Sequence, residues 1–571
     1  MTFLVNDPSK FPTELADGFL AANRRYVRKV FGGAVRATQS KPGKVALVVG
    51  GGTGHHPAFG GWVGQGMADG VVFGNIFSSP SATQAVSVGR AANQGGGVLI
   101  AFGNYAGDVL HFGEAAERLK AEGIPACIAV VTDDIASAPP EERHKRRGIC
   151  GWVTVFKVTG AACEEGKSLE EVIEVFNHVN DRTRTFGVAF SGCTLPGADR
   201  PLFTVPAGKM GVGLGVHGEP GIYDADLGTA DEVAQLLVDG LLKEAPAQAG
   251  HRVIALLNGL GSTTYEELFV TYGAVERLLG EAGVTVVDCE VGELTTSMDM
   301  GGVSLTLTWL SDDIERYWNA PVDTPAIRRG VLEAPAFIDD STLATEAPTT
   351  SVKAQGSEAS QAAARQVVSG LGAVLAALED REQELGDLDA IAGDGDHGVG
   401  MVRGAASGLG AARQLAERGA GIQTVLVGAG EQWSTQAGGT SGALWGAVLA
   451  AAGRALGDSD PVDAPAQVRA ARAAADALQW IGKAELGDKT MLDAVLPFVD
   501  TLEARLSSGE TPASAWRAAA DVAERAAQAT APLRPRIGRA RPLADRSVGH
   551  ADAGAVSFAC IVSTIADMTS G

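Results

Sequence analysis

The first third of the chain alternates short apolar runs with longer amphipathic segments. The runs are rich in Val, Ile, Leu and Ala and lack a polar face, which is typical of strands buried on both sides. The segments between them, such as 81–92 and 113–121, carry apolar residues at helical spacing. Strands alternating with helices predict α/β layers around a largely parallel sheet. The predicted strands are 45–50, 71–74, 98–102 and 126–131.

The same alternation resumes near residue 185. We therefore expect an N-terminal α/β domain at 1–333 with two α/β subdomains, at about 1–184 and 185–333. The predicted elements of the second subdomain are strands at 253–257 and 284–289 and helices at 231–242 and 266–279.

Residues 334–358 break both patterns, because they are polar, contain prolines and show no periodicity. They predict an interdomain linker. After them strand signals nearly vanish, and Ala, Leu, Glu and Arg recur at helical spacing. We expect an all-α domain at 359–571, a helical barrel of about eight helices joined by Gly-rich turns. The predicted helices are 359–380, 399–415, 424–436, 441–456, 464–480, 490–507, 513–529 and 553–568.

Composition narrows the class of protein. A chain of 571 residues is too long for one core, and 45% hydrophobic with 20% charged residues is typical of a soluble globular protein. The net charge of −22 argues against nucleic acid and against an anionic membrane surface as partners. It still allows phosphate substrates, because Mg²⁺ and backbone N–H groups supply local positive potential.

The six cysteines form no CxxC pair and fit no zinc-site spacing. We expect them to be reduced, and therefore expect a cytoplasmic location. The first residues lack a basic segment followed by a long apolar one, so we expect no signal peptide. No uninterrupted apolar run of about 20 residues predicts a membrane span.

A Gly-rich turn at 393–398 follows one carboxylate and contains two more. Asp389, Asp394 and Asp396 lie at positions i, i+5 and i+7. Carboxylates crowded on a tight turn repel one another unless a cation lies among them. Hard oxygen ligands that leave room for other groups suit Mg²⁺ with substrate phosphates. The turn therefore predicts a Mg-nucleotide site.

The predicted strand at 45–50 runs into Gly50-Gly51-Gly52-Thr53-Gly54-His55-His56. Glycines in this place allow a ligand to approach the backbone closely. The spacing fits a dinucleotide fingerprint poorly, and no ribose-binding acid follows at the expected distance. A nicotinamide-dependent oxidoreductase and a plain turn with surface histidines remain alternatives.

Two further loops carry chemistry. Asp108 follows the strand at 98–102, where α/β ligands bind, although a helix cap is the simpler interpretation. His217 stands in Gly215-Val216-His217-Gly218-Glu219, a loop unsuited to helix or strand, and a neutral imidazole can attack a carbonyl. Together the three loops could bind a small polyol with a carbonyl. His217 would attack the carbonyl carbon, while His55 and Asp108 would polarise or deprotonate a hydroxyl.

These residues belong to eight ordered motifs, and the chain resembles the single-chain dihydroxyacetone kinases. In that family a ketose-binding K-type domain is fused to a nucleotide-binding L-type domain. The motifs carrying the resemblance are 50–55, 74–80, 104–108 and 215–221 in the first domain, and 393–398, 438–443, 487–493 and 538–555 in the second.

The resemblance implies that His217 holds the ketone carbon as a reversible hemiaminal, which would exclude glycerol because it has no carbonyl. It implies that His55 and Asp108 act on the hydroxyl that attacks the γ-phosphate. Asp389, Asp394 and Asp396 would hold Mg²⁺ on ATP. The implied substrate-binding residues are Gly52, Thr53, Gly54, His55, Gly103 and Asp108, and the implied nucleotide-binding residues are His397, Gly398, Val399, Thr440, Ser441, Gly482, Thr490, Met491, Asp552, Ala553 and Gly554.

Two positions depart from the pattern of relatives that act on dihydroxyacetone. His56 replaces a common Glu, and Gly103 replaces a common Lys. Replacing Lys by Gly removes a charged donor and is expected to open space beside the substrate. We therefore keep a four-carbon ketose such as erythrulose beside dihydroxyacetone.

The prediction is an ATP-dependent kinase that acts on a terminal hydroxyl of a short-chain ketose. The resemblance also implies a homodimer. The alternatives are a non-catalytic ketose sensor and a ketose kinase coupled to the phosphotransferase system. The carboxylates at 389, 394 and 396 argue against a sensor, since a sensor does not need Mg²⁺ ligands.

Overall fold

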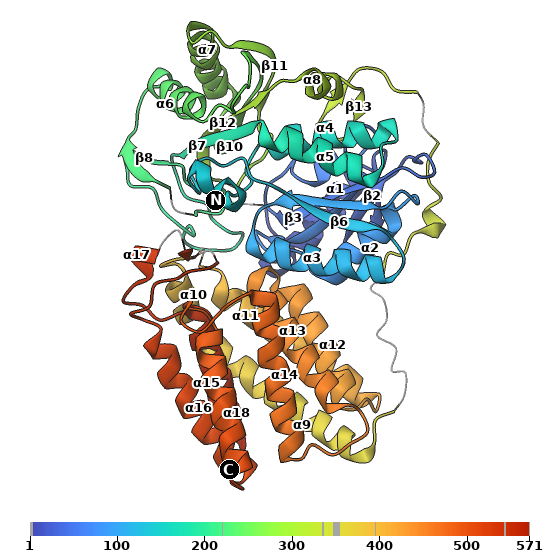
Figure 1. Ribbon diagram of the computed structural model, residues 1–571, viewed down its shortest axis with the longest axis vertical. Helices are drawn as coiled ribbons and strands as arrows, with labels where there is room; N and C mark the ends of the chain where they lie inside the picture. Colours follow the sequence, from blue (N-terminus) through green and yellow to red (C-terminus); the bar gives the residue numbers. More distant parts are fainter. Residues whose placement is uncertain are drawn as a thin grey trace. The chain divides into compact units, whose positions relative to one another are not determined.

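The structure is a computed structural model that describes residues 4–219, 221–333, 336–346, 355–393, 395–538, 540–541 and 544–569. The chain forms two compact units, Met1–Ala347 and Pro348–Gly571 (Figure 1). Residues 334–335 and 347–354 of the predicted linker lie outside the described residues.

The first sheet of the N-terminal unit has the strand order β1-β2-β4-β3-β5-β6. The four predicted strands correspond to β3–β6 and pair in parallel, as expected. An antiparallel hairpin, β1–β2, extends the sheet beyond the prediction. The bounds are β1 Val27–Val30, β2 Gly33–Arg36, β3 Ala46–Thr53, β4 Gly70–Ile76, β5 Val98–Gly103 and β6 Ala126–Val131.

Alternate residues of the central strands enter different cores. Leu47 and Leu99 pack with Phe156 of α4 and with α5, whereas Val48 and Ile100 pack with α2 and α3. Helices therefore cover both faces of the sheet (Figure 1). The helices are α1 Phe11–Ala22, α2 Ala82–Ala92, α3 Ala106–Ala121, α4 Trp152–Glu165 and α5 Leu169–Asp181, with short 3-10 turns at Pro8–Lys10, Gly60–Trp62 and Pro140–Lys145.

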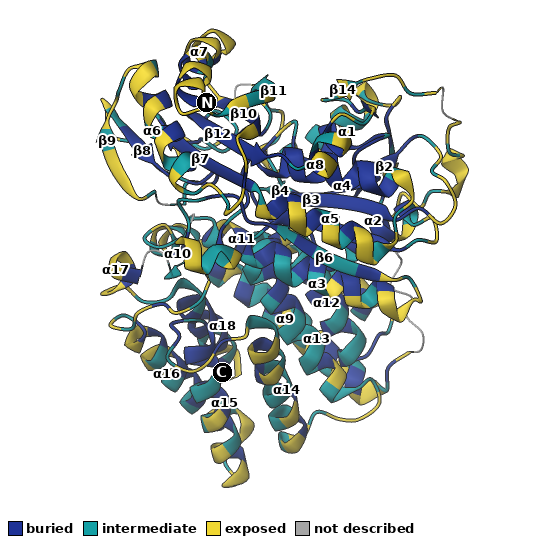
Figure 2. Cartoon of the chain, turned by 45° about the horizontal axis from the view of Figure 1, so that its top comes forward, coloured by how far each residue is buried: buried dark blue, intermediate teal, exposed yellow. Residues whose placement is uncertain are grey.

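The second sheet has the order β11-β10-β12-β7-β8-β9 and is mostly antiparallel, with only β10 and β11 parallel among its described pairs. Figure 2 shows its central strands as almost wholly buried. The bounds are β7 Thr183–Ala189, β8 Lys209–Val212, β9 Tyr223–Asp226, α6 Ala230–Lys243, β10 Arg252–Gly261, α7 Tyr265–Glu281, β11 Thr285–Gly292, β12 Gly301–Trp309, α8 Asp312–Trp318, β13 Val322–Asp323 and β14 Arg328–Arg329, followed by a 3-10 turn at Asp340–Thr342.

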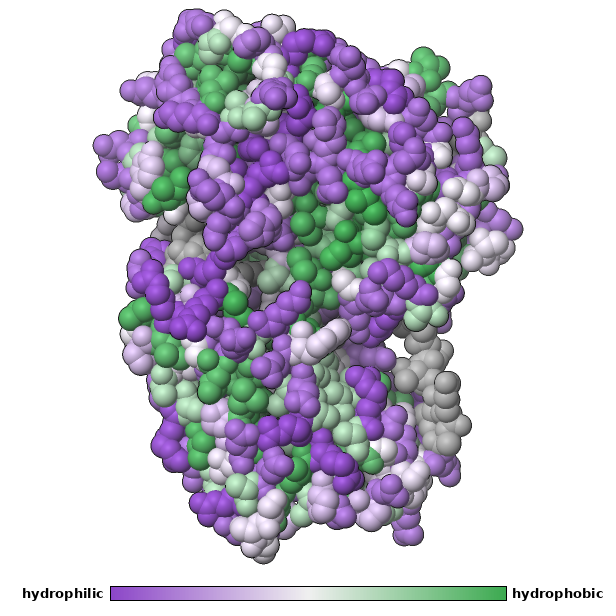
Figure 3. All heavy atoms as spheres, in the orientation of Figure 1, coloured by the Kyte–Doolittle hydropathy of each residue, from purple (hydrophilic) through white to green (hydrophobic). Residues whose placement is uncertain are grey.

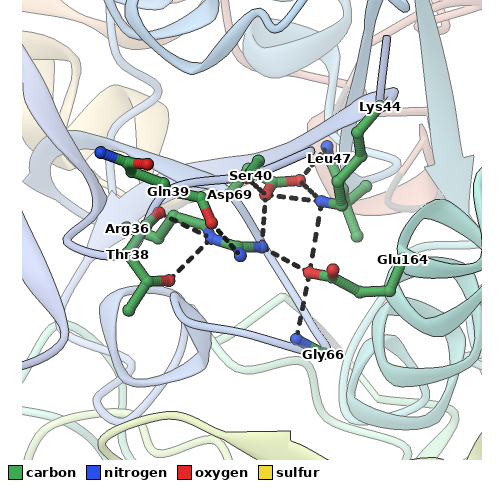
Figure 4. Close-up of polar contacts among 9 residues, drawn as sticks. All are labelled: Arg36, Thr38, Gln39, Ser40, Lys44, Leu47, Gly66, Asp69 and Glu164. Atoms are coloured by element: carbon green, nitrogen blue, oxygen red, sulfur yellow. Dashed lines mark hydrogen bonds and ion pairs between the residues drawn. The ribbon is translucent and has the colours of Figure 1, made fainter. Parts of the chain in front are cut away.

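A buried ion network joins three parts of the first sheet (Figure 4). Asp69, at the start of β4, accepts from Arg36 Nη1 at 3.0 Å, from Lys44 Nζ at 2.5 Å and from the backbone N–H of Leu47 at 3.0 Å. Glu164 of α4 pairs with the same two cations. Two carboxylates thus face two cations in the interior, and each charge has a partner.

The C-terminal unit is all helical in its described part. The eight predicted helices correspond to α9, α11–α16 and α18, and the prediction missed the short helices α10 and α17. The bounds are α9 Glu358–Asp380, α10 Glu382–Asp389, α11 His397–Glu417, α12 Ile422–Ala437, α13 Gly439–Leu456, α14 Ala464–Gly482, α15 Leu492–Ser507, α16 Pro512–Ala529, α17 Ala544–Ser547 and α18 Ala553–Thr569.

Helix α9 is long and apolar enough, by length and composition alone, to cross a membrane. Its residues Ala364, Leu371, Val374 and Leu378 nevertheless belong to the apolar core shared with α11, α15 and α18. We therefore interpret α9 as a core helix of the bundle. The face shown in Figure 3 carries hydrophilic residues over each unit, with patches of apolar residues among them.

Candidate active site

The loop that carries His55 is shaped by glycines. A Cβ at Gly52 would lie 2.7 Å from the backbone of Phe77, and Gly54 has φ +103°. The amide of Phe77 donates to Thr53 O at 2.9 Å, and that of Met298 donates to Gly54 O at 3.1 Å. The loop is therefore held between two other loops, and only glycine allows this approach.

The structure brings His55 and His217 together. Their Nε2 atoms are 2.9 Å apart, and the two residues are 2% and 7% exposed. His55 Nδ1 lies 2.9 Å from Thr296 O. The rings of Phe77 and Tyr105 pack against His217 at 5.2 Å and 5.0 Å between centroids. Burial, and then the neighbouring His217, lowers the pKa of His55 to about 3.

Asp108 and Gly103 lie at the junction of β5 and α3. Asp108 is buried in the first turn of α3, three residues after Tyr105. A Cβ at Gly103 would lie 2.8 Å from the Trp152 ring and 2.9 Å from the Tyr105 ring. These two aromatic rings fill the space into which a side chain at position 103 would point. The expectation that Gly103 opens this space beside the substrate is therefore wrong.

Sequence reasoning assigned no role to Glu219, although it stands two residues after His217. Its Oε1 lies 2.8 Å from His217 Nδ1, and its Oε2 accepts from the His217 amide at 3.0 Å. Behind it, Arg147 Nη1 lies 3.8 Å from Glu219 and Nη2 lies 2.9 Å from Asp134. The i, i+2 spacing was the only local signal of this contact. Nothing local pointed to Arg147 or Asp134.

In the C-terminal unit His397 joins the starts of three helices. It is the first residue of α11, and its Nδ1 lies 3.1 Å from Ser441 Oγ in the first turn of α13. Its Nε2 lies 2.9 Å from Ser557 Oγ near the start of α18. Helix N-termini present free N–H groups and positive potential, which suit phosphate.

Several carboxylate side chains lie near His397. Burial lowers the pKa of His397, while the nearby charges of Asp389 and Asp396 act in the opposite direction. Burial raises the pKa of Asp552 to about 7, and Asp389 adds to the shift. Asp394 lies outside the described residues. In the part of the chain that is described, no three His, Cys, Asp or Glu side chains are grouped as metal ligands. The carboxylates of Asp389, Asp396 and Asp552 are half-buried, and a divalent cation among them would relieve their mutual repulsion.

The other predicted nucleotide residues lie at helix ends of the same unit. A Cβ at Gly398 would lie 2.0 Å from Glu382 O, so packing alone requires glycine there. A Cβ at Gly554 would lie 3.3 Å from Met491, so the starts of α15 and α18 are adjacent. Thr440, Gly482, Thr490 and Ala553 lie at the start of α13, the end of α14, just before α15 and the start of α18, and Val399 is in the first turn of α11.

Comparisons with known proteins cover both units. The chain matches the Dak1 domain over residues 17–326 and the DAK2 domain over residues 391–567. It is 54% identical over 570 residues to the D-erythrulose kinase of Mycolicibacterium smegmatis, with 99% of this chain and 98% of that protein covered. It is 52% identical over 569 residues to the L-erythrulose kinase of Pectobacterium atrosepticum, with 99% and 96% covered.

Among solved structures, the chain is similar to the dihydroxyacetone kinase from C. freundii in complex with AMP-PNP and Mg²⁺. The TM-score is 0.54 at 27% sequence identity, and the match covers 99% of each chain.

Proposed function

Because the chain belongs to the dihydroxyacetone kinase family, with a Dak1 and a DAK2 domain in one polypeptide, we propose that it phosphorylates a terminal hydroxyl of erythrulose. It is an ATP-dependent kinase for short-chain ketoses. We assign ketose binding to residues 1–333 and nucleotide binding to 359–571. The two family matches fall within these ranges.

The observation that carries the ketose site is the contact of His55 with His217 on two loops at sheet edges. In our proposal His217 adds to the ketone carbon and holds the sugar as a hemiaminal. The rings of Phe77 and Tyr105 restrict the His217 ring to one orientation. Glycerol has no carbonyl, so the same pocket would hold it only weakly.

His55 and Asp108 then act on the terminal hydroxyl. Both side chains are buried. His55 lies two residues after β3, and Asp108 lies in the first turn of α3, the helix that follows β5. Gly52, Thr53 and Gly54 would offer backbone groups to the sugar, although Phe77 fills the space beside the two glycines. Phosphoryl transfer depends mainly on positioning and charge neutralisation, so a weakly basic His55 suffices to orient the hydroxyl.

The nucleotide site is assigned to the helix starts around His397. Backbone N–H groups at Ser441 and Gly554 would bind phosphate oxygens. Asp389 and Asp396, with Asp394, would hold Mg²⁺, which when bound neutralises charge on the phosphates. The C. freundii enzyme was crystallised with AMP-PNP and Mg²⁺, which supports this assignment.

Erythrulose is preferred over dihydroxyacetone because relatives at 54% and 52% identity are named D- and L-erythrulose kinases. Gly103 does not add to this preference, because the rings of Trp152 and Tyr105 fill the space beside it. Both enantiomers stay candidates.

A coupled ATP-consumption assay over both erythruloses, dihydroxyacetone, glyceraldehyde and glycerol tests this function. We expect the highest kcat/KM for one erythrulose enantiomer and the lowest for glycerol. Ketose binding without ATP turnover would instead identify a sensor. Tightly held ADP that never exchanges with free nucleotide would identify phosphotransferase coupling.

Two further expectations belong to this proposal. A homodimer rests on the family resemblance, and light scattering of the purified chain tests it. A cytoplasmic location is supported by the six cysteines, all of which are free.

A further inference from the structure

The hydrogen bonds around the two histidines form one continuous chain. It runs from the carbonyl of Thr296 through His55 and His217 to the carboxylate of Glu219, with successive distances of 2.9, 2.9 and 2.8 Å. Both ends of this chain are acceptors, since a carbonyl and a carboxylate donate nothing. Each of the three hydrogen bonds therefore requires its own proton on an imidazole nitrogen.

Two neutral imidazoles carry only two protons, so the cluster holds one more. The ring of His55 resists protonation because burial lowers its pKa to about 3. The doubly protonated ring is therefore His217, which donates to Glu219 and to His55. In this state His55 donates through Nδ1–H to Thr296 and accepts at Nε2.

Charges behind Glu219 agree with this assignment. Arg147 contacts both Glu219 and Asp134. One cation between two carboxylates leaves an excess negative charge, and a protonated His217 cancels it. Two further titratable groups on this side of the cluster are Tyr105, whose OH donates to Gly148 O, and Asp133, which accepts backbone amides.

Building on the proposed function, we propose that Glu219 is a positioning residue that keeps His217 as an imidazolium and supplies, through this pairing, the proton that the ketone oxygen needs. As His217 Nε2 forms its bond to the ketone carbon, the C=O π pair moves to oxygen. That oxygen takes the proton shared between the two Nε2 atoms. The product is an N-substituted imidazolium that still donates Nδ1–H to Glu219.

This addition step needs no proton from solvent. Before and after addition the cluster of His217 and Glu219 has the same net charge, so ketose binding should neither take up nor release a proton. The step also frees the Nε2 lone pair of His55, because His217 Nε2 loses its proton and bonds to the ketone carbon, so it no longer donates to His55. His55 is then able to accept from a sugar hydroxyl.

The test is Glu219→Gln, with Glu244→Gln as the matched control. Glu244 is also a carboxylate paired with a buried arginine, Arg146, at 3.0 Å for both hydrogen bonds, but it pairs with neither histidine. In Glu219→Gln we expect the KM for erythrulose to rise at least about tenfold and to increase further with pH from about 6 to 8. The rise with pH is expected because, without the Glu219 carboxylate to keep it protonated, His217 is a neutral imidazole, and the proton for the ketone oxygen must then come from solvent. The KM for ATP should stay within about twofold, and Glu244→Gln and the wild type should show no trend of ketose KM with pH.

A second measurement does not depend on any variant folding. Calorimetric titration of the wild type with erythrulose in two buffers of different ionisation enthalpy should give the same binding enthalpy. Buffer-dependent enthalpy would overturn the proposal, as would a Glu219→Gln enzyme with wild-type ketose KM and a flat pH profile. His217→Ala distinguishes failure of the proposed function from failure of this inference. If His217→Ala raises the ketose KM while Glu219→Gln does not, covalent binding of the ketose by His217 is supported and only the role of Glu219 is refuted.

Discussion

Asp69→Asn removes the central carboxylate of the network in Figure 4 while keeping its shape. The side chains of Asp69, Arg36 and Lys44 are 3%, 5% and 2% exposed, so solvent cannot replace the lost charge. Two cations would then share the carboxylate of Glu164 alone. The amide also places a donor against Lys44, which has nothing to accept it.

Breaking a buried pair of this kind costs about 3–5 kcal/mol. For a unit of 347 residues, the usual entropy of unfolding per residue converts this into a fall in Tm of about 4–7 °C. The difference in Tm between Asp69→Asn and the wild type should be smaller in acid, because the ion network also weakens in the wild type there. Burial acts to raise the pKa of Glu164, but Lys44 and Arg36 outweigh it and lower it from 4.5. A carboxylate of lowered pKa stabilises the fold at neutral pH, and that stabilisation is lost as pH falls through the lowered value.

Scanning calorimetry of the intact chain at pH 7 and in acid measures both effects. Asp226→Asn is the control, because it removes an exposed pair with Lys209 and should leave Tm unchanged. At a temperature where Asp69→Asn is folded, we expect its KM for ketose and for ATP to match the wild type. A Tm within about 1 °C of the wild type at pH 7 would refute the reasoning, since it would show that the network contributes no net stability.

Three further variants test the sites. His217→Asn keeps a polar side chain but removes the nucleophile, so the ketose KM should rise at least about tenfold and the preference for ketose over glycerol should fall. Unchanged selectivity in the coupled assay would contradict a covalent bond between His217 and the ketose. Gly103→Ala should cost about 1–3 kcal/mol by crowding Trp152 and Tyr105 and should raise ketose KM, as thermal unfolding and kinetics would show; a wild-type Tm would contradict the close packing. Asp389→Asn should reduce kcat at least about a hundredfold at any Mg²⁺ concentration, while ketose binding measured by calorimetry survives; lost ketose binding would contradict the assignment of the two sites to separate units.

Local pattern was sufficient for much of the fold. Strands β3–β6 were predicted because each is an apolar run between helix-like segments, and eight helices of the C-terminal unit because their apolar residues repeat at helical spacing. Helix α4 was missed because Trp152–Cys163 are buried on every side, so no polar face marks the helical period. The hairpin strands β8 and β9 are too short to show any period.

Candidate residues could be found from the sequence where their neighbours were unusual. Glycines around His55, His217 and the 393–398 turn marked backbone shaped for a ligand. The role of Gly103 was misjudged, because the sequence does not show that Trp152 and Tyr105 fill the space beside it.

By itself, the sequence determined which segments become helices and strands and which residue types can do chemistry, since both depend on neighbours a few positions away. Only the tertiary structure decided that His55 meets His217 across 162 positions of chain and that Arg147 stands behind Glu219. The hydrogen-bond chain from Thr296 through both histidines to Glu219 follows from that meeting. A proton's position depends on every donor and acceptor within about 3 Å, and distance along the chain does not report distance in space.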